Sequence, residues 1–351
     1  MTTTERETSM PCRITRRGFA AGTLGALALP ALRVRAAEPI RLRASLDTAP
    51  SHGRNIAIAD YLHKVERESG GRIKTELFQS GQLFPDLDVG KALIQGQVDM
   101  ACPGSWTITG IVPNADLFQL PALYGQPLEV VHKVIDGRAG AIVAADIAAR
   151  LRAQVLGPWL DLGYQNWYSN GRKLESVADL RGMKIRNSGG AGQAWRARFF
   201  GAIPNTTAWP NVPLALSQHT FDGLVSTDES LASAKLWEAG VKYSLADHMF
   251  CGEYIPMVSL AFWQSLTPDD RAMMTALWAA NIAAYRTGMA QRQIEARKAL
   301  EAHGVGFADP TPEVLAATRQ TMLPHSAEVA KDIKIVPEIV GIVGEDAGIA
   351  G

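Results

Sequence analysis

The sequence has no excess of charge of one sign, few cysteines and, in its main part, no long hydrophobic run. Its 351 residues contain 35 Lys and Arg and 35 Asp and Glu, so a basic nucleic-acid-binding face is not indicated. The three cysteines form no CxxC motif, and no HExxH motif is present, which leaves no local signature of a metal site. Beyond residue 37 no stretch approaches the roughly 18 uncharged apolar residues of a membrane-spanning helix. We therefore expect no nucleic-acid partner, no metal, no cofactor and no membrane span.

The remaining composition is that of an ordinary folded protein. Hydrophobic residues make up 47% of the chain and charged residues 20%, which excludes a disordered, collagenous or coiled-coil protein. The length predicts about two domains and is sufficient for a substantial hydrophobic core.

The first 37 residues differ from this average and predict an export signal. They hold six of the basic and two of the acidic residues, which leaves 29 basic and 33 acidic residues and a net charge of −4. The arginine pair of Thr15–Phe19 precedes an apolar stretch, Ala20–Leu32, and the small residues of Val34–Ala37 follow. This order is typical of a twin-arginine signal peptide over 1–37, removed near Ala36/Ala37 on the way to the periplasm. A membrane-anchored helix is the alternative, but 13 residues span only about 20 Å of a core about 30 Å thick.

The cysteines have two possible states after removal of that segment. Cys12 would leave with the signal, and Cys102 and Cys251 would remain. An oxidising compartment allows them to pair, but apolar neighbours are also typical of free cysteines in a core. We expect both to be free and buried.

The hydrophobic pattern of the mature chain alternates between strand and helix periods. Strand patterns cover 40–46, 72–78, 98–102, 182–186 and 221–225, and helical patterns cover 56–68, 86–95, 192–200, 212–218 and 268–303. A second α/β unit is expected to begin near Gln154. This order predicts an α/β fold with parallel strands, in two lobes, with a long helix at 268–303 that crosses both. A ligand would bind between the lobes, and hinge closure would bury it.

Several segments in collinear order resemble one family. The segments are 69–74, 81–83, 95–101, 118–124, 179–186 and 221–223, of which Asp179–Arg186 is very similar to the signature DLKGLKIR. Over residues 40–300 the sequence resembles the DctP-like solute-binding subunit of tripartite ATP-independent periplasmic (TRAP) transporters. The resemblance implies a type II-like periplasmic binding protein with a hinge between two lobes. We expect lobe I to comprise 38–163 and 252–291, and lobe II 164–251 and 292–351.

The resemblance also implies partners and an anchoring residue. Such a receptor delivers its ligand to the small and large integral-membrane permease subunits, which an ion gradient drives. The arginine that closes the signature grips a substrate carboxylate, which assigns that role to Arg186.

The residues around Arg186 support the same role independently. Arg186 ends a predicted strand, and a Gly-rich segment then leads into a helix whose first N–H groups also favour an anion. A guanidinium meets a carboxylate with two parallel, charge-assisted hydrogen bonds. The alternative is a surface arginine paired with a neighbouring side chain.

Other candidates follow from departures from the family pattern. Gln165 stands where relatives often have a second arginine, so a simple dicarboxylate is less favoured, and Ser226 replaces an asparagine that often touches ligand. Asp228 could read a hydroxyl or amine, or could instead be a helix N-cap. The remaining candidates are Asn187 beside the anchor, Ser105 and His52 in the first lobe, and Trp209 as an apolar wall. Trp106 could also line the first lobe. For both tryptophans and for His52, a structural role is the alternative.

An enzyme is the less favoured function. No Gly-x-Ser-x-Gly elbow or local metal motif is present. A ligand-sensing protein for a membrane sensor would share the fold and is a further alternative. We expect a receptor for a small carboxylate-bearing organic acid, with a monocarboxylate, a sugar acid, a hydroxy or keto acid and an ectoine-like zwitterion all open.

Overall fold

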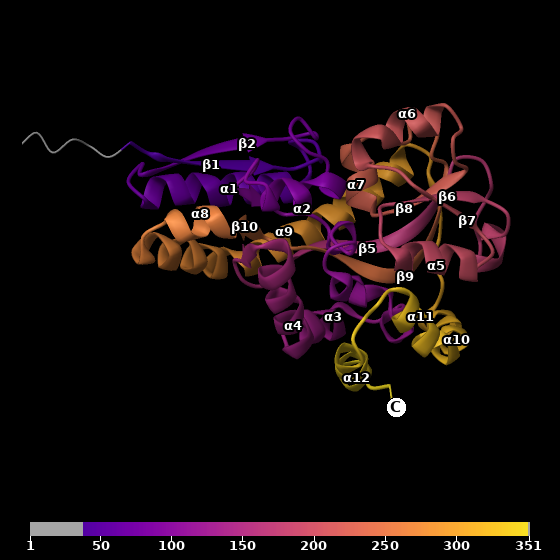
Figure 1. Ribbon diagram of the computed structural model, residues 1–351. Coiled ribbons are helices and arrows are strands. Elements are labelled where there is room, and N and C mark those ends of the chain that lie inside the picture. The colour runs from indigo at the N-terminus through magenta and orange to yellow at the C-terminus, as the bar shows by residue number, and fades with distance from the viewer. Residues whose placement is uncertain (1–37, 350–351) are drawn as a thin grey trace, which may run out of the picture. The chain divides into compact units, whose positions relative to one another are not determined.

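The computed structural model describes residues 38–349, and Glu38–Gly351 forms one compact unit (Figure 1). The predicted signal peptide, 1–37, lies outside the described residues. The first sheet has five strands in the order β2-β1-β3-β10-β4. Its strands are β1 (Ile40–Ser45), β2 (Ile73–Phe78), β3 (Met100–Ala101), β4 (Ala153–Val155) and β10 (Met257–Ser259). β1 pairs in parallel with β2 and β3, whereas β10 is antiparallel to β3 and β4.

The second sheet has six strands in the order β11-β9-β5-β8-β6-β7. They are β5 (Leu160–Ser169), β6 (Lys184–Asn187), β7 (Ile203–Thr206), β8 (Gly223–Ser226), β9 (Tyr243–Tyr254) and β11 (Gly306–Ala308). β6 is parallel to β7 and β8, and β9 is parallel to β11, but the long strand β5 is antiparallel to both β8 and β9.

Helices pack around both sheets. They are α1 (Gly53–Glu68), α2 (Asp86–Ile94), α3 (Leu128–Ile135), α4 (Arg138–Asp146), α5 (Ala191–Phe199), α6 (Val212–Ser217), α7 (Asp228–Ser233), α8 (Leu260–Ser265), α9 (Pro268–Ala302), α10 (Pro312–Met322), α11 (Ser326–Asp332) and α12 (Pro337–Asp346). Figure 1 shows α1 along β1 and β2, and α5 beside β6 and β7. Among residues 38–349, no helix combines the length and apolarity that crossing a membrane requires.

The chain passes between the two sheets three times, twice through short connections and once through α8 and α9, which lead from β10 to β11. It leaves β4 for β5 through residues 156–159, and it returns from β9 to β10 through Ile255 and Pro256. The 35-residue helix α9 contacts α1 on the first side and α7 and β5 on the second. This helix therefore spans both lobes, as the sequence predicted.

Most predicted elements are present, with two corrections. The expectation of parallel strands is wrong for β5 and β10, which run antiparallel to their neighbours because each enters its sheet directly from the other sheet; β9 is antiparallel to β5 and parallel to β11. The segment near Gln154 does not begin the second α/β unit: β4 pairs with β10 in the first sheet. Cys102 and Cys251 are both free and buried, as expected.

Candidate functional site

Arg186 is a buried cation without an acidic partner. It lies on β6 and is 2% exposed. Its Nε and Nη2 donate to the carbonyl of Thr207 at 2.9 and 2.8 Å, and Nη1 donates to Oγ of Ser188 at 2.9 Å. Within residues 38–349 it forms no salt bridge, and burial lowers the pKa of its guanidinium to about 10, against the opposing effects of Asp47 and Tyr254. Arg186 is therefore charged at neutral pH with only neutral oxygens to bind it.

A pocket between the two sheets contains this guanidinium. Fourteen residues from both sides of the molecule line it. Nine of them are Asp, Thr, Ser, Gln or Arg residues, which can form hydrogen bonds through a carboxyl, hydroxyl, amide or guanidinium group. The lining residues are Asp47, Thr48, Asp86, Leu87, Trp106, Thr107, Leu162, Gln165, Arg186, Ser188, Trp209, Ser226, Ser230 and Tyr254. A pocket with apolar and aromatic walls, several polar side chains and one cation without a salt bridge suits a small anionic ligand.

A second arginine beside the pocket is, by contrast, fully paired. Arg54 is 0% exposed and bonds Asp47 at 2.7 Å and Asp86 at 2.6 Å. The face of Tyr254 lies 4.2 Å from its guanidinium carbon. Burial raises the pKa of Asp86 to about 7, with Arg54 opposing this and Asp47 adding to it. Two carboxyl groups thus share one guanidinium, which leaves Arg54 no unpaired charge for a ligand.

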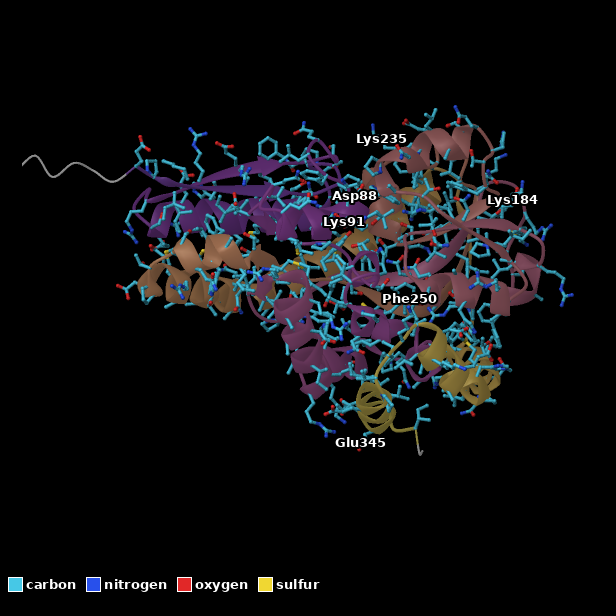
Figure 2. The ribbon with its side chains drawn as sticks, in the orientation of Figure 1. Asp88, Lys91, Lys184, Lys235, Phe250 and Glu345 are labelled. Atoms are coloured by element: carbon cyan, nitrogen blue, oxygen red, sulfur yellow. The ribbon has the colours of Figure 1, made fainter. Side chains whose placement is uncertain are left out.

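Aromatic rings close the pocket on two sides. The ring of Trp209 lies 5.5 Å from the guanidinium carbon of Arg186. Trp106 contacts Phe250 edge-to-face with centroids 6.4 Å apart; Phe250, labelled in Figure 2, is 1% exposed. Gly104 permits this packing, because a Cβ there would lie 2.3 Å from the Trp106 ring.

The family follows from comparison with known proteins. The sequence profile described as "Bacterial extracellular solute-binding protein, family 7" matches residues 47–332, most of the chain. The chain belongs to this family. The prediction from the sequence motifs is thereby confirmed, and the protein is a solute receptor of the TRAP type.

Individual relatives of this solute receptor cover most of its length. The C4-dicarboxylate-binding periplasmic protein of Rhodobacter capsulatus is 27% identical over 311 residues, which cover 88% of this chain and 90% of that protein. The sugar acid binding protein of Advenella mimigardefordensis, solved with galactonate, has a TM-score of 0.83 at 22% identity and covers 90% of this chain and 99% of its own. A TRAP periplasmic solute-binding protein of Ralstonia eutropha, solved with bound (S)-2-acetolactate, has a TM-score of 0.79 at 24% identity. The match covers 88% of this chain and 99% of that one. These structures confirm the two-lobe α/β fold.

Four of the residues predicted from sequence lie together in the pocket of the receptor. Arg186, Gln165, Ser226 and Trp209 all line it, although β6, β5, β8 and the turn before α6 carry them. Arg186 is not the surface arginine of the alternative interpretation, because it is buried. Trp106, also considered, lines the opposite wall.

Asn187 and Ser105 are buried near the pocket but do not line it. Oδ1 of Asn187 accepts from the Gly189 N–H at 3.2 Å and the Thr206 hydroxyl at 2.8 Å, so this side chain holds the turn after β6. Ser105 is 2% exposed at the start of the short 3₁₀ helix Ser105–Thr107, whose next residue, Trp106, reaches the pocket instead.

His52 and Asp228 make structural contacts and do not line the pocket. His52 caps α1, where its Nδ1 accepts from the Arg54 N–H at 3.1 Å, and its Nε2 faces Ser230 at 3.1 Å. Asp228 accepts from the Tyr168 hydroxyl and lines a different pocket. The interpretation of Asp228 as an N-cap is wrong, because Thr227 caps α7.

The Gly-rich start of α5 lies outside the pocket lining, because none of residues 189–193 lines it. Asp116 accepts from the Gly192 N–H at 2.9 Å, and Oε1 of Gln193 accepts from the N–H of Ser188, which precedes the helix, at 3.0 Å. The Gly192 N–H, which was expected to favour an anion, is therefore bonded to a protein carboxyl group.

Sequence reasoning missed Arg54 with its partners Asp47 and Asp86, and also Tyr254. A signal was available for Asp47, which lies two residues beyond the carboxyl end of the parallel strand β1, where α/β proteins place their ligands. No local signal pointed to Tyr254, because β9 had no recognisable strand period.

Proposed function

We propose that this solute receptor binds a small organic acid through one carboxylate, which Arg186 grips. The observation that carries the proposal is a buried guanidinium, without a salt bridge in residues 38–349, on the wall of the pocket between the lobes. A buried charge without a partner is costly, so a ligand carboxylate that pairs with it gains a strong, specific interaction. Trp209 forms an apolar wall beside this contact.

The pocket favours a monocarboxylate that carries hydroxyl groups. Arg54 is neutralised by two acids, and Gln165 brings an amide that cannot compensate a second negative charge. Asp47, Thr48 and Ser226 offer donors and acceptors suited to hydroxyl groups. The relatives solved with galactonate and acetolactate, both hydroxylated monocarboxylates, support this ligand class.

The same proposal includes the setting of the receptor. The protein is exported through the signal peptide over 1–37 and works in the periplasm, where it passes its ligand unchanged to a TRAP permease and is not an enzyme. The lobes that close on the ligand are 38–163 with 252–291, and 164–251 with 292–351. Family membership supports the extracytoplasmic role.

Thermal melting with and without candidate ligands tests the binding site. We expect galactonate or another hydroxylated monocarboxylate at about 100 times its Kd to raise the Tm by a few degrees, with succinate and neutral sugars much weaker. Arg186→Ala should raise the Kd at least tenfold, a loss of about 1.4 kcal/mol or more. Arg186→Lys should also weaken binding, because an ammonium lacks the planar fork.

The matched control is Arg41→Ala, since the Arg41 side chain is 75% exposed. It should leave the Kd unchanged. Tight binding that survives Arg186→Ala, or binding confined to neutral compounds, would contradict the proposed site. Recovery of a chemically altered ligand after unfolding the protein would instead indicate an enzyme.

A further inference from the structure

Glu253 is a buried carboxyl group whose oxygens accept no hydrogen bond from residues 38–349. It lies near the end of β9 and is 0% exposed. Both Oε1 and Oε2 are fully enclosed and accept no hydrogen bond. Buried carboxylates in folded proteins are almost always paired or bound to a cation, so this residue requires a partner.

Two further metal-ligating side chains face Glu253. Asp161 is its direct neighbour on the antiparallel strand β5, and His132 reaches the same place from α3. Nε2 of His132 lies 2.9 Å from Oδ1 of Asp161. One ligating atom from each of the three residues lies within 4.8 Å of the other two.

One guanidinium lies beside this cluster. Arg286 holds Asp136 through two bonds of 2.7 and 2.9 Å, and its Nε lies 3.4 Å from Asp161. Its charge is therefore shared with Asp136, and no cation among residues 38–349 forms a salt bridge with Glu253. A divalent cation would supply the positive charge that two adjacent buried carboxylates need in order to be ionised together.

We propose that His132, Asp161 and Glu253 form a binding site for a divalent transition-metal ion. One imidazole nitrogen and two carboxylate oxygens are donors that Zn²⁺ accepts at about 2.0–2.2 Å. Calcium takes six to eight oxygen ligands and does not suit this set. His132 is the accessible member, with 27% of its side chain exposed, so the ion enters from its side.

The site lies beside the points at which the chain passes between the sheets. Asp161 follows the first connection, and Glu253 precedes the second. Along a strand, successive side chains point to opposite faces. The next residues, Leu162 and Tyr254, accordingly line the ligand pocket while Asp161 and Glu253 face His132. A bound ion would join α3 to both connecting strands, independently of the organic-acid site.

Metal titration of the chelator-treated protein tests the site. We expect isothermal titration calorimetry to show one equivalent of Zn²⁺ bound, with a higher Tm, and Ca²⁺ to bind at least tenfold more weakly. Glu253→Gln and Asp161→Asn should each weaken Zn²⁺ binding at least tenfold. His132→Ala provides a third variant with a partly exposed side chain, in case either buried substitution prevents folding.

The matched control is Glu328→Gln, which removes the carboxylate from an exposed histidine–carboxylate pair at 3.0 Å. It should leave Zn²⁺ binding unchanged. Failure of the wild-type protein to bind Zn²⁺ would overturn the proposal, and so would equal binding by wild type, Glu253→Gln and His132→Ala. A Glu253→Gln protein more stable than metal-free wild type, with no Zn²⁺ binding in either, would show that a shared proton fills this place.

Discussion

Asp116 is a residue whose burial should make the stability of the protein depend on pH. It is 2% exposed and accepts from the Gly192 N–H, while its Oδ1 accepts no hydrogen bond from the described part of the chain. Burial raises the pKa of this carboxyl group to about 7, against the lowering effects of Gly192 and Arg196. The folded state therefore keeps a proton that the unfolded chain releases near pH 4, and stability should fall as pH rises from about 4 through about 7.

Asp116→Asn should remove that contribution, because the amide oxygen still accepts from Gly192 and never ionises. Relative to wild type, the variant should gain on the order of 2–4 kcal/mol of unfolding free energy between pH 5 and pH 8, since one pKa unit is worth about 1.4 kcal/mol. Urea unfolding at several pH values measures this. The control is Asp88→Asn on the exposed side of α2 (Figure 2), which should show no such trend. Parallel pH curves for Asp116→Asn and wild type would contradict the argument.

A single ligand-anchoring residue is easier to predict from sequence than a network of paired side chains. Arg186 could be found because a strand end, a Gly-rich turn and a family motif coincide at one place. The pairing of Arg54 with Asp86 joins side chains 32 residues apart, and only the folded chain shows that this cation is already neutralised. Asn187 and Asp228 were chosen by position in sequence, whereas neighbouring hydrogen-bond partners decide where their side chains point.

Among the helices, two glycines offer opposite outcomes for the same substitution. Gly192, in α5, lies against Gln119, and a Cβ there would meet the Gln119 Cβ at 2.4 Å. Gly288, in α9, has nothing within 4 Å of such a Cβ. In a free helix, alanine is favoured over glycine by about 1 kcal/mol.

Gly288→Ala should therefore stabilise the protein by about 0.5–1 kcal/mol. Gly192→Ala should destabilise it by about 1–3 kcal/mol, since the overlap with a Cβ forces the backbone to move and outweighs helix propensity. Denaturant unfolding of both variants decides between the two effects. Stabilisation by Gly192→Ala would show that α5 can move away from Gln119 at little cost.

Five helices were predicted from sequence, whereas the two long strands of the second sheet were not. α1, α2, α5, α6 and α9 end within a few residues of their predicted bounds, because amphipathic periodicity and terminal residues mark them. β5 and β9 are buried on both faces and show no period of two; in β9, ten of the eleven residues from Ser244 to Tyr254 are buried, and His248 is the exception. These two strands carry Gln165 and Tyr254 of the pocket and two of the three proposed metal ligands, Asp161 and Glu253, so each site could be only partly predicted.

Across the whole molecule, Glu229 connects elements of both lobes with α9. Its Oε1 accepts from the Gly53 N–H at 2.9 Å and from Arg292 at 3.1 Å, and its Oε2 lies 2.9 Å from His52. Gly53 and His52 begin α1 beside the first sheet, Glu229 lies on α7 after β8 of the second, and Arg292 is on α9. One carboxylate thus holds three separate elements beside the ligand pocket.

Glu229→Gln should lower the free energy of unfolding by about 2 kcal/mol at pH 7, because a buried amide leaves the charge of Arg292 without its carboxylate partner. Burial alone would raise the pKa of Glu229, but His52, the Gly53 N–H and Arg292 together lower it below 4.5. The stabilisation is therefore fully present above that value and is lost as pH falls through the folded-state pKa. The gap between wild type and variant should be widest near neutral pH and close in acid. The control is Glu301→Gln, which removes a carboxylate from an exposed pair with Arg297 at 2.6 Å. It should lower the free energy of unfolding by less than about 0.5 kcal/mol at any pH. An equally small, pH-independent loss for Glu229→Gln would mean that α9 and the sheet connections hold the lobes together without this carboxylate.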